Sequence, residues 1–203
     1  MTSIRKTKAA ETKMKIYDSA EQLFKKYGID NVSVDSIVEM AGVSKGAFYV
    51  HFDSKDSLVA AHIAEFVNKL DLDYKAYYES FPPDTSASDM LISLLGKIVD
   101  VVAFSLGYEL MRIVYGVQLT KTVDTDAIMG YNRDLYKIFN SIISKGVQQG
   151  EFKAELGIDT ITNHCVMAIR GLSYEWCIRY PDFDFRDQTL KHFEMLLTGI
   201  KKQ

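Results

Sequence analysis

The chain has 203 residues, of which 47% are hydrophobic, so it can bury a sizeable core without covalent staples. Its two cysteines exclude a disulfide framework, and no apolar run has the length expected of a signal peptide or a membrane span, so we expect a cytoplasmic protein. The net charge of −3 is distributed unevenly along the chain. Residues 1–55 carry nine Lys and Arg against seven Asp and Glu, a charge of +2, whereas the rest of the chain carries fifteen Lys and Arg against twenty Asp and Glu, a charge of −5. A polyanion would therefore meet the N-terminal part.

Apolar residues in the N-terminal part recur mostly at helical spacing, which predicts short helices separated by glycine turns and begun by serine caps. The third of these segments is ambiguous, because its aromatic and β-branched residues would also suit a strand. The predicted elements are a helix over 8–27 ended by Gly28, a helix over 34–41 capped by Ser33 and ended by Gly42, and a segment over 45–52 capped by Ser44.

The remainder is also predicted to be helical, because it contains only three prolines and keeps the three- and four-residue apolar spacing. The clearest break is the segment 80–88 with its Pro-Pro pair. The predicted helices run over 55–78, capped by Ser54, and then over 87–105, 108–119, 125–149, 158–179 and 186–200. The expected fold is all-α, with a small domain over 1–55, a helical bundle over 56–203, and the helix over 55–78 connecting the two.

Residues 33–46 have the layout of a helix-turn-helix, in which the second helix enters the major groove of DNA. Ile37, Ala41 and Val43 can pack against the first helix, and Gly42 can make the turn. Lys45 then faces outward, together with Tyr49 and His51. Layout alone leaves an ordinary helical corner as the alternative.

The run VDSIVEMAGVSKGAFYVHFDSKDSL, residues 34–58, closely resembles the signature of TetR-family regulators. It combines an Ala-Gly-Val-Ser turn, a Gly-x-x-Tyr-x-His-Phe segment and a Ser-Lys-x-x-Leu helix start, in order and without gaps. The resemblance favours a helix over a strand for 45–52. It implies phosphate contacts from the Tyr49 hydroxyl and from Lys55. Phe48 departs from the family pattern, which commonly has a smaller aliphatic residue there, and we expect Phe48 and Phe52 to fill the core beneath the helix. The residues that the resemblance places at the DNA surface are Ser33, Ser44, Lys45, Gly46, Tyr49, His51 and Lys55.

The basic N-terminal segment has two interpretations. Its lysines and arginine could follow the adjacent groove of DNA, as flexible arms of DNA-binding modules do, or they could belong to a solvated terminus. The residues concerned are Arg5, Lys6, Lys8, Lys13 and Lys15.

The larger part is rich in bulky, adaptable side chains, most of which we expect to be core, although a helical bundle that encloses a small molecule uses the same residue types. Arg112, His164 and Arg170 are the polar residues set within its apolar runs. An ordinary core histidine and arginines paired with Glu109 or Glu175 are the alternatives, whereas two arginines facing a cavity would favour an anionic ligand. The candidate pocket residues are Phe104, Tyr108, Met111, Arg112, Tyr115, Phe139, His164, Met167, Arg170 and Tyr174.

The last two helices carry broad apolar faces, and the family resemblance implies that two helices from each subunit form a four-helix dimer interface. The alternative is that these faces only close the core of a single chain. The candidate interface residues are Ile169, Leu172, Trp176, Phe193 and Leu197.

These patterns predict a ligand-responsive transcriptional regulator, most simply a repressor that binds a palindromic operator as a homodimer and is released by a small-molecule effector. One alternative is a small-molecule-binding interaction adaptor without DNA binding. Another is a helical-bundle enzyme, for which the sequence offers little: His164 and Cys165 point about 100° apart on a helix, and we find no metal-ligand spacing, phosphate loop or nucleophile motif. We therefore expect no enzyme, no cofactor and no metal.

Overall fold

The computed structural model describes residues 2–121, 126, 130 and 133–202. Within them the ordered elements are helices, and the only β feature is an isolated antiparallel bridge between Phe152 and Lys201, so the all-α prediction is confirmed. The chain divides into two compact units. We call Met1–Glu65 with Val117–Thr125 the head, and Phe66–Gly116 with Asp126–Gln203 the body.

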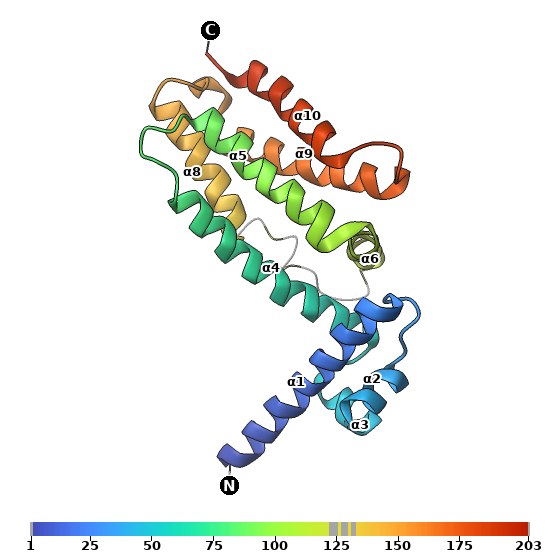
Figure 1. Cartoon of the computed structure of the whole chain (residues 1–203). Coiled ribbons are helices and arrows are strands. Elements are labelled where there is room, and N and C mark those ends of the chain that lie inside the picture. The colour runs from blue at the N-terminus through green and yellow to red at the C-terminus, as the bar shows by residue number, and fades with distance from the viewer. Residues whose placement is uncertain (1, 122–125, 127–129, 131–132, 203) are drawn as a thin grey trace. The chain divides into compact units, whose positions relative to one another are not determined.

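The helices of the head match the predicted ones except that the first begins at Thr2 and not at residue 8, and the disputed third segment is a helix. They are α1 (Thr2–Tyr27), α2 (Val34–Ala41), α3 (Lys45–His51) and the first part of α4 (Lys55–Glu79), which continues into the body (Figure 1). A separate small core holds α1, α2 and α3 together, centred on Ile16, Ile37 and Phe48, none of which has exposed surface. The serine caps predicted for α2 and α3 are confirmed.

The body contains the remaining helices, except for the last residues of α6, which belong to the head. In order they are α5 (Ala87–Asp100), a π-helical turn η1 (Val101–Leu106), α6 (Gly107–Thr120), α8 (Asp134–Gln148), a 3-10 turn η2 (Ala154–Leu156), α9 (Ile158–Arg179) and α10 (Phe185–Ile200). The predicted helix over 87–105 therefore ends early and passes into a π-helical turn. The start of the predicted helix over 125–149 lies outside the described residues, apart from 126 and 130.

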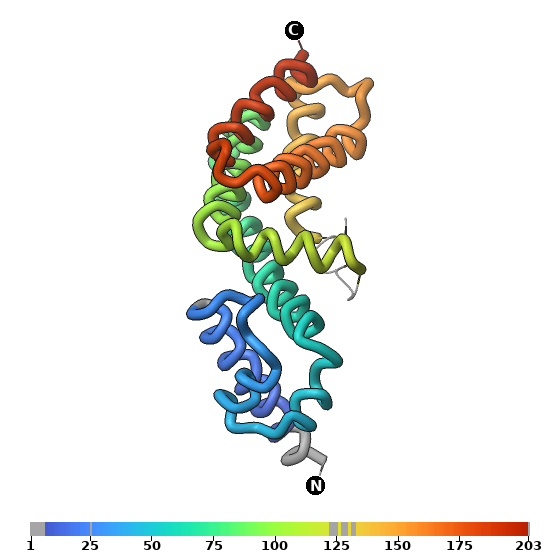
Figure 2. Tube along the Cα trace, turned by 90° about the vertical axis from the view of Figure 1, so that its right-hand side faces the viewer, coloured from blue at the N-terminus to red at the C-terminus, as the bar shows by residue number. Residues whose placement is uncertain are grey.

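Four helices of the body close on one another, because α5 packs against α8 and α10, and α9 packs against the same two. Figures 1 and 2 both show α9 and α10 side by side. Between α8 and η2, Glu151 accepts hydrogen bonds from the backbone N–H groups of Ala87 (2.8 Å) and Ser88 (3.1 Å), and so caps the start of α5. Such a carboxylate satisfies donors that the helix itself leaves open.

Contrary to the expectation from the sequence, one helical run has the length and composition expected of a membrane span. The helical run Ala87–Thr120, which joins α5, η1 and α6, is long and apolar enough to cross a membrane by length and composition. The run is interrupted at Gly107, whose φ of 72° lies outside the helical region, and α5 buries its apolar residues in the body core. The same composition is found in core helices of globular domains.

Candidate nucleic-acid interface

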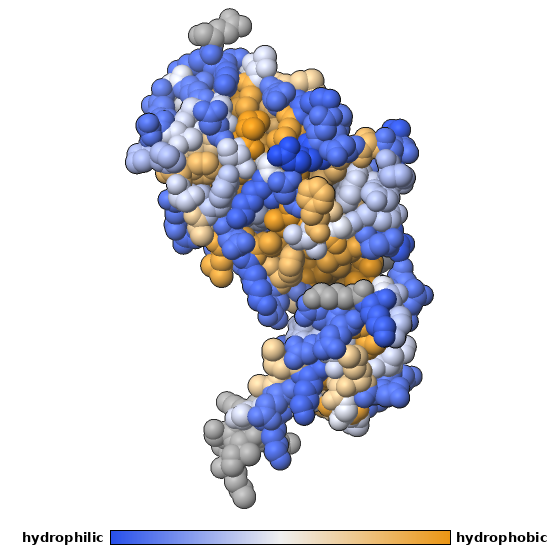
Figure 3. Space-filling model, in the orientation of Figure 1, coloured by the Kyte–Doolittle hydropathy of each residue, from blue (hydrophilic) through white to orange (hydrophobic). Residues whose placement is uncertain are grey.

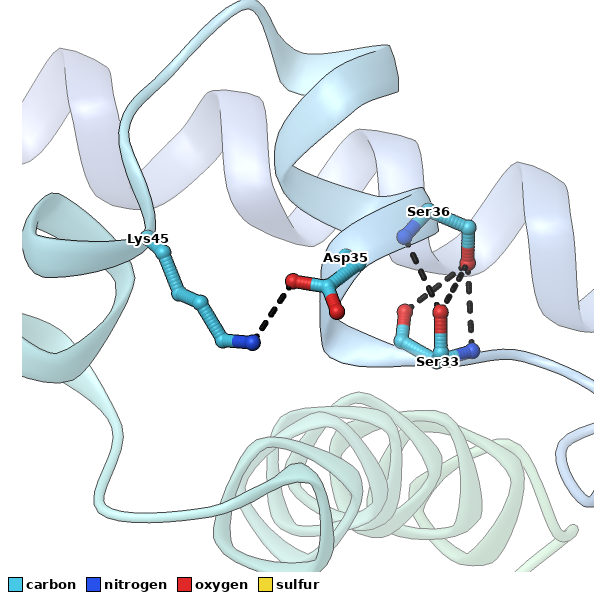
Figure 4. Close-up of polar contacts among 4 residues, drawn as sticks. All are labelled: Ser33, Asp35, Ser36 and Lys45. Atoms are coloured by element: carbon cyan, nitrogen blue, oxygen red, sulfur yellow. Dashed lines mark hydrogen bonds and ion pairs between the residues drawn. The ribbon is translucent and has the colours of Figure 1, made fainter.

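The helix-turn-helix begins with a reciprocal cap on α2. The Ser33 hydroxyl accepts a hydrogen bond from the Ser36 backbone N–H (3.1 Å), and the Ser36 hydroxyl accepts one from the Ser33 backbone N–H (3.1 Å), as Figure 4 shows. A capping box of this kind satisfies two backbone donors at once and fixes where the helix begins. Ser33 itself remains exposed.

The turn follows from Gly42, which has a φ of 64° and ends α2 in the left-handed conformation. The backbone N–H groups of Gly42 and Val43 return to carbonyls of α2, at 3.2 Å from Glu39 and 3.1 Å from Val38. A residue with a Cβ would be strained at this φ, which explains the glycine. Ser44 then begins α3 by accepting a hydrogen bond from the Ala47 N–H at 3.1 Å.

The two sides of α3 differ sharply. Phe48 is fully buried and Phe52, directly after the helix, is 5% exposed, as predicted for core residues. The opposite side is open: Lys45, Gly46 and Tyr49 are exposed, and His51 is half-buried. Because the buried side anchors α3 to α1 and α2, the helix presents a firm outer surface.

Sequence reasoning missed Val50, which at 78% is the most exposed large apolar side chain among the described residues of the head. The strand-like composition of the segment concealed it. Once Phe48 faces inward on a helix of 3.6 residues per turn, the position two residues later faces away from the core. An exposed apolar side chain here can contact a thymine methyl group in the major groove.

Lys45 lies at the start of α3 and pairs with Asp35 of α2 at 2.7 Å (Figure 4). Both side chains are largely exposed, and the Asp35 carboxylate raises the pKa of the Lys45 ammonium through a hydrogen bond. An exposed pair of this kind is weak, so the ammonium can exchange its partner for a base edge or a phosphate.

The structure gives Lys55 a different environment from the one that the resemblance implied. Its ammonium donates hydrogen bonds to the carbonyls of Ile29 (2.9 Å) and Val32 (3.0 Å), in the turn between α1 and α2. The side chain is half-buried. Lys55 therefore joins the first turn of α4 to the helix-turn-helix, and its predicted phosphate contact would require it to leave these carbonyls.

The basic N-terminal segment is helical in the structure, because α1 already begins at Thr2. Lys13 lies over the rings of Tyr17 and Phe52, at 5.8 and 5.7 Å from their centres. Lys8 and Lys15 are exposed, whereas the side chains of Arg5 and Lys6 lie outside the described residues.

Comparison with known proteins agrees with this geometry. Residues 16–62 match the family described as bacterial regulatory proteins, tetR family. The HTH-type transcriptional regulator AcrR of Shigella flexneri is 37% identical over 206 residues, covering 95% of this chain and 92% of that protein. The chain belongs to the TetR family.

Solved structures of TetR-family and related regulators share the fold over nearly the whole chain. A TetR-family regulator from Pectobacterium atrosepticum superposes with a TM-score of 0.76 at 18% identity, covering 97% of both chains. The transcriptional regulator FadR of Bacillus subtilis, solved with stearoyl-CoA, has a TM-score of 0.69 at 20% identity, covering 92% of this chain and 98% of FadR. The protein is thus a helix-turn-helix transcriptional regulator, and its body corresponds to the helical ligand-binding domain of this family.

The structure brings together only some of the predicted pocket residues. The Tyr115 hydroxyl donates to the Arg170 carbonyl at 3.0 Å, and its ring meets that of Tyr174 edge-on at 5.5 Å. The Arg170 guanidinium lies over the Tyr136 ring, 5.1 Å from its centre, and donates to the Tyr136 hydroxyl. Burial raises the pKa of Tyr115 to about 12. Sequence reasoning missed Tyr136, which is 7% exposed.

The other pocket candidates are dispersed. Arg112 is exposed and pairs with Glu109 at 3.5 Å, the alternative that the sequence left open for it. His164 is exposed on α9 and is not a core histidine. Phe139 is fully buried in the core, Met111 and Tyr108 are half-buried against it, and Phe104 and Met167 are exposed by 79% and 47%.

The predicted dimer residues lie mostly inside the body. Trp176, Phe193 and Leu197 are buried in its core, where the Trp176 ring stacks on that of Phe185 at 5.2 Å. Ile169 and Leu172 are half-buried against the same core. The apolar faces that could have served both core and partner are therefore taken up by the core at three of the five positions.

Proposed function

We propose that the protein is a repressor that binds a palindromic operator as a homodimer through α3 and releases it when a small-molecule effector binds the body. The observation that carries the proposal is the two-sided α3, with Phe48 fully buried and Lys45, Tyr49 and Val50 exposed. In this proposal Tyr49 and the start of α4 position the protein on phosphates, while Lys45 and Val50 read bases. Lys55 acts as a brace in this proposal, because its hydrogen bonds to Ile29 and Val32 hold the turn between α1 and α2 to the start of α4.

A dimer is supported by α9, whose outer face holds exposed Met167, Tyr174 and Ile178 around Gly171. A glycine inside a helix costs about 1 kcal/mol relative to alanine. A Cβ at Gly171 would meet nothing within 4 Å in the single chain, so the fold of the chain does not require a glycine there. A second helix that packs closely across this face would require a residue without a side chain there.

The dimer proposal is tested by Gly171→Trp, with Lys137→Trp at an exposed position of α8 as the control for a bulky surface residue. Light scattering should give twice the 23.0 kDa chain mass for the wild type and the control, and the single-chain mass for Gly171→Trp. A wild type that scatters as a single chain at micromolar concentration contradicts the proposal.

For the effector we propose that the route to DNA passes along α4, which is continuous from head to body. Tyr74 is buried in the body core and Leu70 packs against it, so a ligand that repacks this core would displace α4. Dimeric readers need half-sites about 34–36 Å apart, so a small displacement would unseat both heads. A coupling of about 1–3 kcal/mol changes affinity roughly 5–150-fold. FadR, solved with stearoyl-CoA, shows that a relative of this fold can hold an acyl thioester.

We further propose that the protein acts in the cytoplasm and carries no catalytic activity. A fluorescence-anisotropy assay against DNA fragments selected from the source genome tests the function itself. The wild type should prefer the selected fragments over shuffled ones, and Tyr49→Ala should lose most of the affinity while keeping its fold. Equal binding to shuffled DNA would favour the interaction-adaptor alternative.

A further inference from the structure

The body has an open cleft of about 710 Å³ between α5, the π-helical turn η1 and the start of α10, with Tyr77 of α4 at one side. Figure 3 shows apolar surface exposed along the seam between α5 and α10, bordered by hydrophilic residues. The volume lies in the range of small-molecule sites. Of the predicted pocket residues, only Phe104 lines this cleft. The cleft is therefore separate from the cluster around Tyr115 and Arg170.

The charges of the cleft leave it with a net charge of +1, from Lys97, Arg186 and Asp100. Arg186 donates from Nε to Asp100 at 2.9 Å, so these two neutralise one another. The Lys97 ammonium lies 4.9 Å from the centre of the Tyr77 ring. Among the described residues, no carboxylate is within ion-pair distance of Lys97. A cation held over an aromatic face beside an apolar floor is a fitting partner for an organic anion.

The floor of the cleft is Gly96, a buried glycine in the interior of α5. Glycine weakens a helix relative to alanine, so it needs a reason at this position. The chain itself does not supply one, because a Cβ here would meet only Nη2 of Arg186, at an ordinary contact distance of 3.8 Å. A flat group lying directly on α5 would supply the reason.

Phe104 forms a second aromatic wall. It is carried by η1 and is 79% exposed, the largest exposure of any bulky apolar side chain in the described part of the chain. A π-helical turn is a rare interruption of a helix and is often found at functional sites. Here it turns a phenylalanine toward solvent at the rim of a cleft that already holds Tyr77.

We propose that this cleft binds an amphiphilic organic anion, with its flat apolar body over Gly96 between Tyr77 and Phe104, and its carboxylate or sulfonate at Lys97. The site is distinct from the proposed DNA-binding surface and from Leu70 and Tyr74 of the proposed effector route, although Tyr77 of the same helix α4 lines it. Its occupant is recognised by one negative charge at the edge of an apolar body.

The test is isothermal titration calorimetry of the full-length protein without DNA, with naphthalene-2-sulfonate as the probe and naphthalene-2-methanol as its neutral counterpart. The wild type should bind the sulfonate about tenfold or more tightly than the alcohol, a difference of about 1.4 kcal/mol. Lys97→Met, which keeps the apolar stem, should abolish this preference. Lys137→Met, at an exposed position of α8 outside the cleft, should bind as the wild type does.

Gly96→Ala separates binding from folding. Alanine should raise the midpoint of thermal unfolding by strengthening α5, while its methyl group weakens binding of both probes. A merely structural glycine would not give these opposite changes. The proposal is overturned if the wild type binds neither probe at millimolar concentration, or if Lys97→Met retains the preference for the sulfonate.

Discussion

The position of Lys55 leads to a prediction that separates bracing from DNA contact. Its ammonium donates two hydrogen bonds to backbone carbonyls, at 2.9 Å to Ile29 and 3.0 Å to Val32. Hydrogen bonds to charged groups contribute about 1.5–3 kcal/mol each, and the half-buried side chain places this pair toward the lower end. Lys55→Met keeps the apolar stem and should therefore lower the free energy of unfolding by about 3 kcal/mol. For a domain of this size that is a fall of roughly 10 °C in the unfolding midpoint.

The assay combines thermal unfolding with operator affinity measured across a salt series. A brace leaves the number of neutralised phosphates unchanged, so the salt slope of Lys55→Met should equal that of the wild type at a temperature where both are folded. A lysine on a phosphate would instead lower the slope by about 0.9 for each phosphate that the variant no longer neutralises. Lys75→Met, an exposed lysine further along α4, is the control for removal of a surface charge. An unchanged midpoint with a reduced slope would refute the brace.

Three further predictions follow from other contacts. Lys45→Ala should reduce discrimination among operator variants by about 1–3 kcal/mol, and Asp35→Asn should strengthen operator binding at low salt by releasing the Lys45 ammonium. Competition anisotropy measures both effects. Retained discrimination by Lys45→Ala would speak against base reading by this lysine. Asp71→Asn should destabilise the body by about 3–5 kcal/mol in denaturant unfolding, because it removes the carboxylate that lies 2.6 Å from the buried guanidinium of Arg133; a much smaller loss would mean that the pair is solvated. Cys165 is buried, and burial raises the pKa of its thiol to about 12, so the thiol should resist Ellman's reagent at pH 8 until the protein unfolds; rapid labelling of the native protein would contradict this. Its contribution to the free energy of unfolding should fall as pH rises from the ordinary thiol pKa of about 9 toward 12.

The head could be predicted in detail because its signals are local. Ser33 and Ser44 cap helices whose N-termini lie within three residues of them, and Gly42 sets the turn by its own backbone. Each feature depends on neighbours in sequence. The resemblance to the family then decided between helix and strand for the segment that contains Phe48.

The candidate sites were harder to predict, because they depend on contacts between distant residues. Lys55 reaches carbonyls 23 and 26 residues away, which no periodicity reveals. Trp176 and Phe193 are residue types that occur in interfaces as well as in cores, and only their packing shows that they belong to the core. The Arg170 contact with Tyr136 likewise joins two helices, so the sequence favoured nearby acids as partners instead.

Sedimentation equilibrium of the full-length protein with a selected operator fragment determines whether a dimer reads DNA through the exposed side of α3. The wild type should form complexes with an even number of chains per operator. Tyr49→Ala should form none, while its dimer mass stays unchanged. A stable complex with one chain per operator, or one that persists in Tyr49→Ala with the same affinity, would contradict this mode of DNA reading.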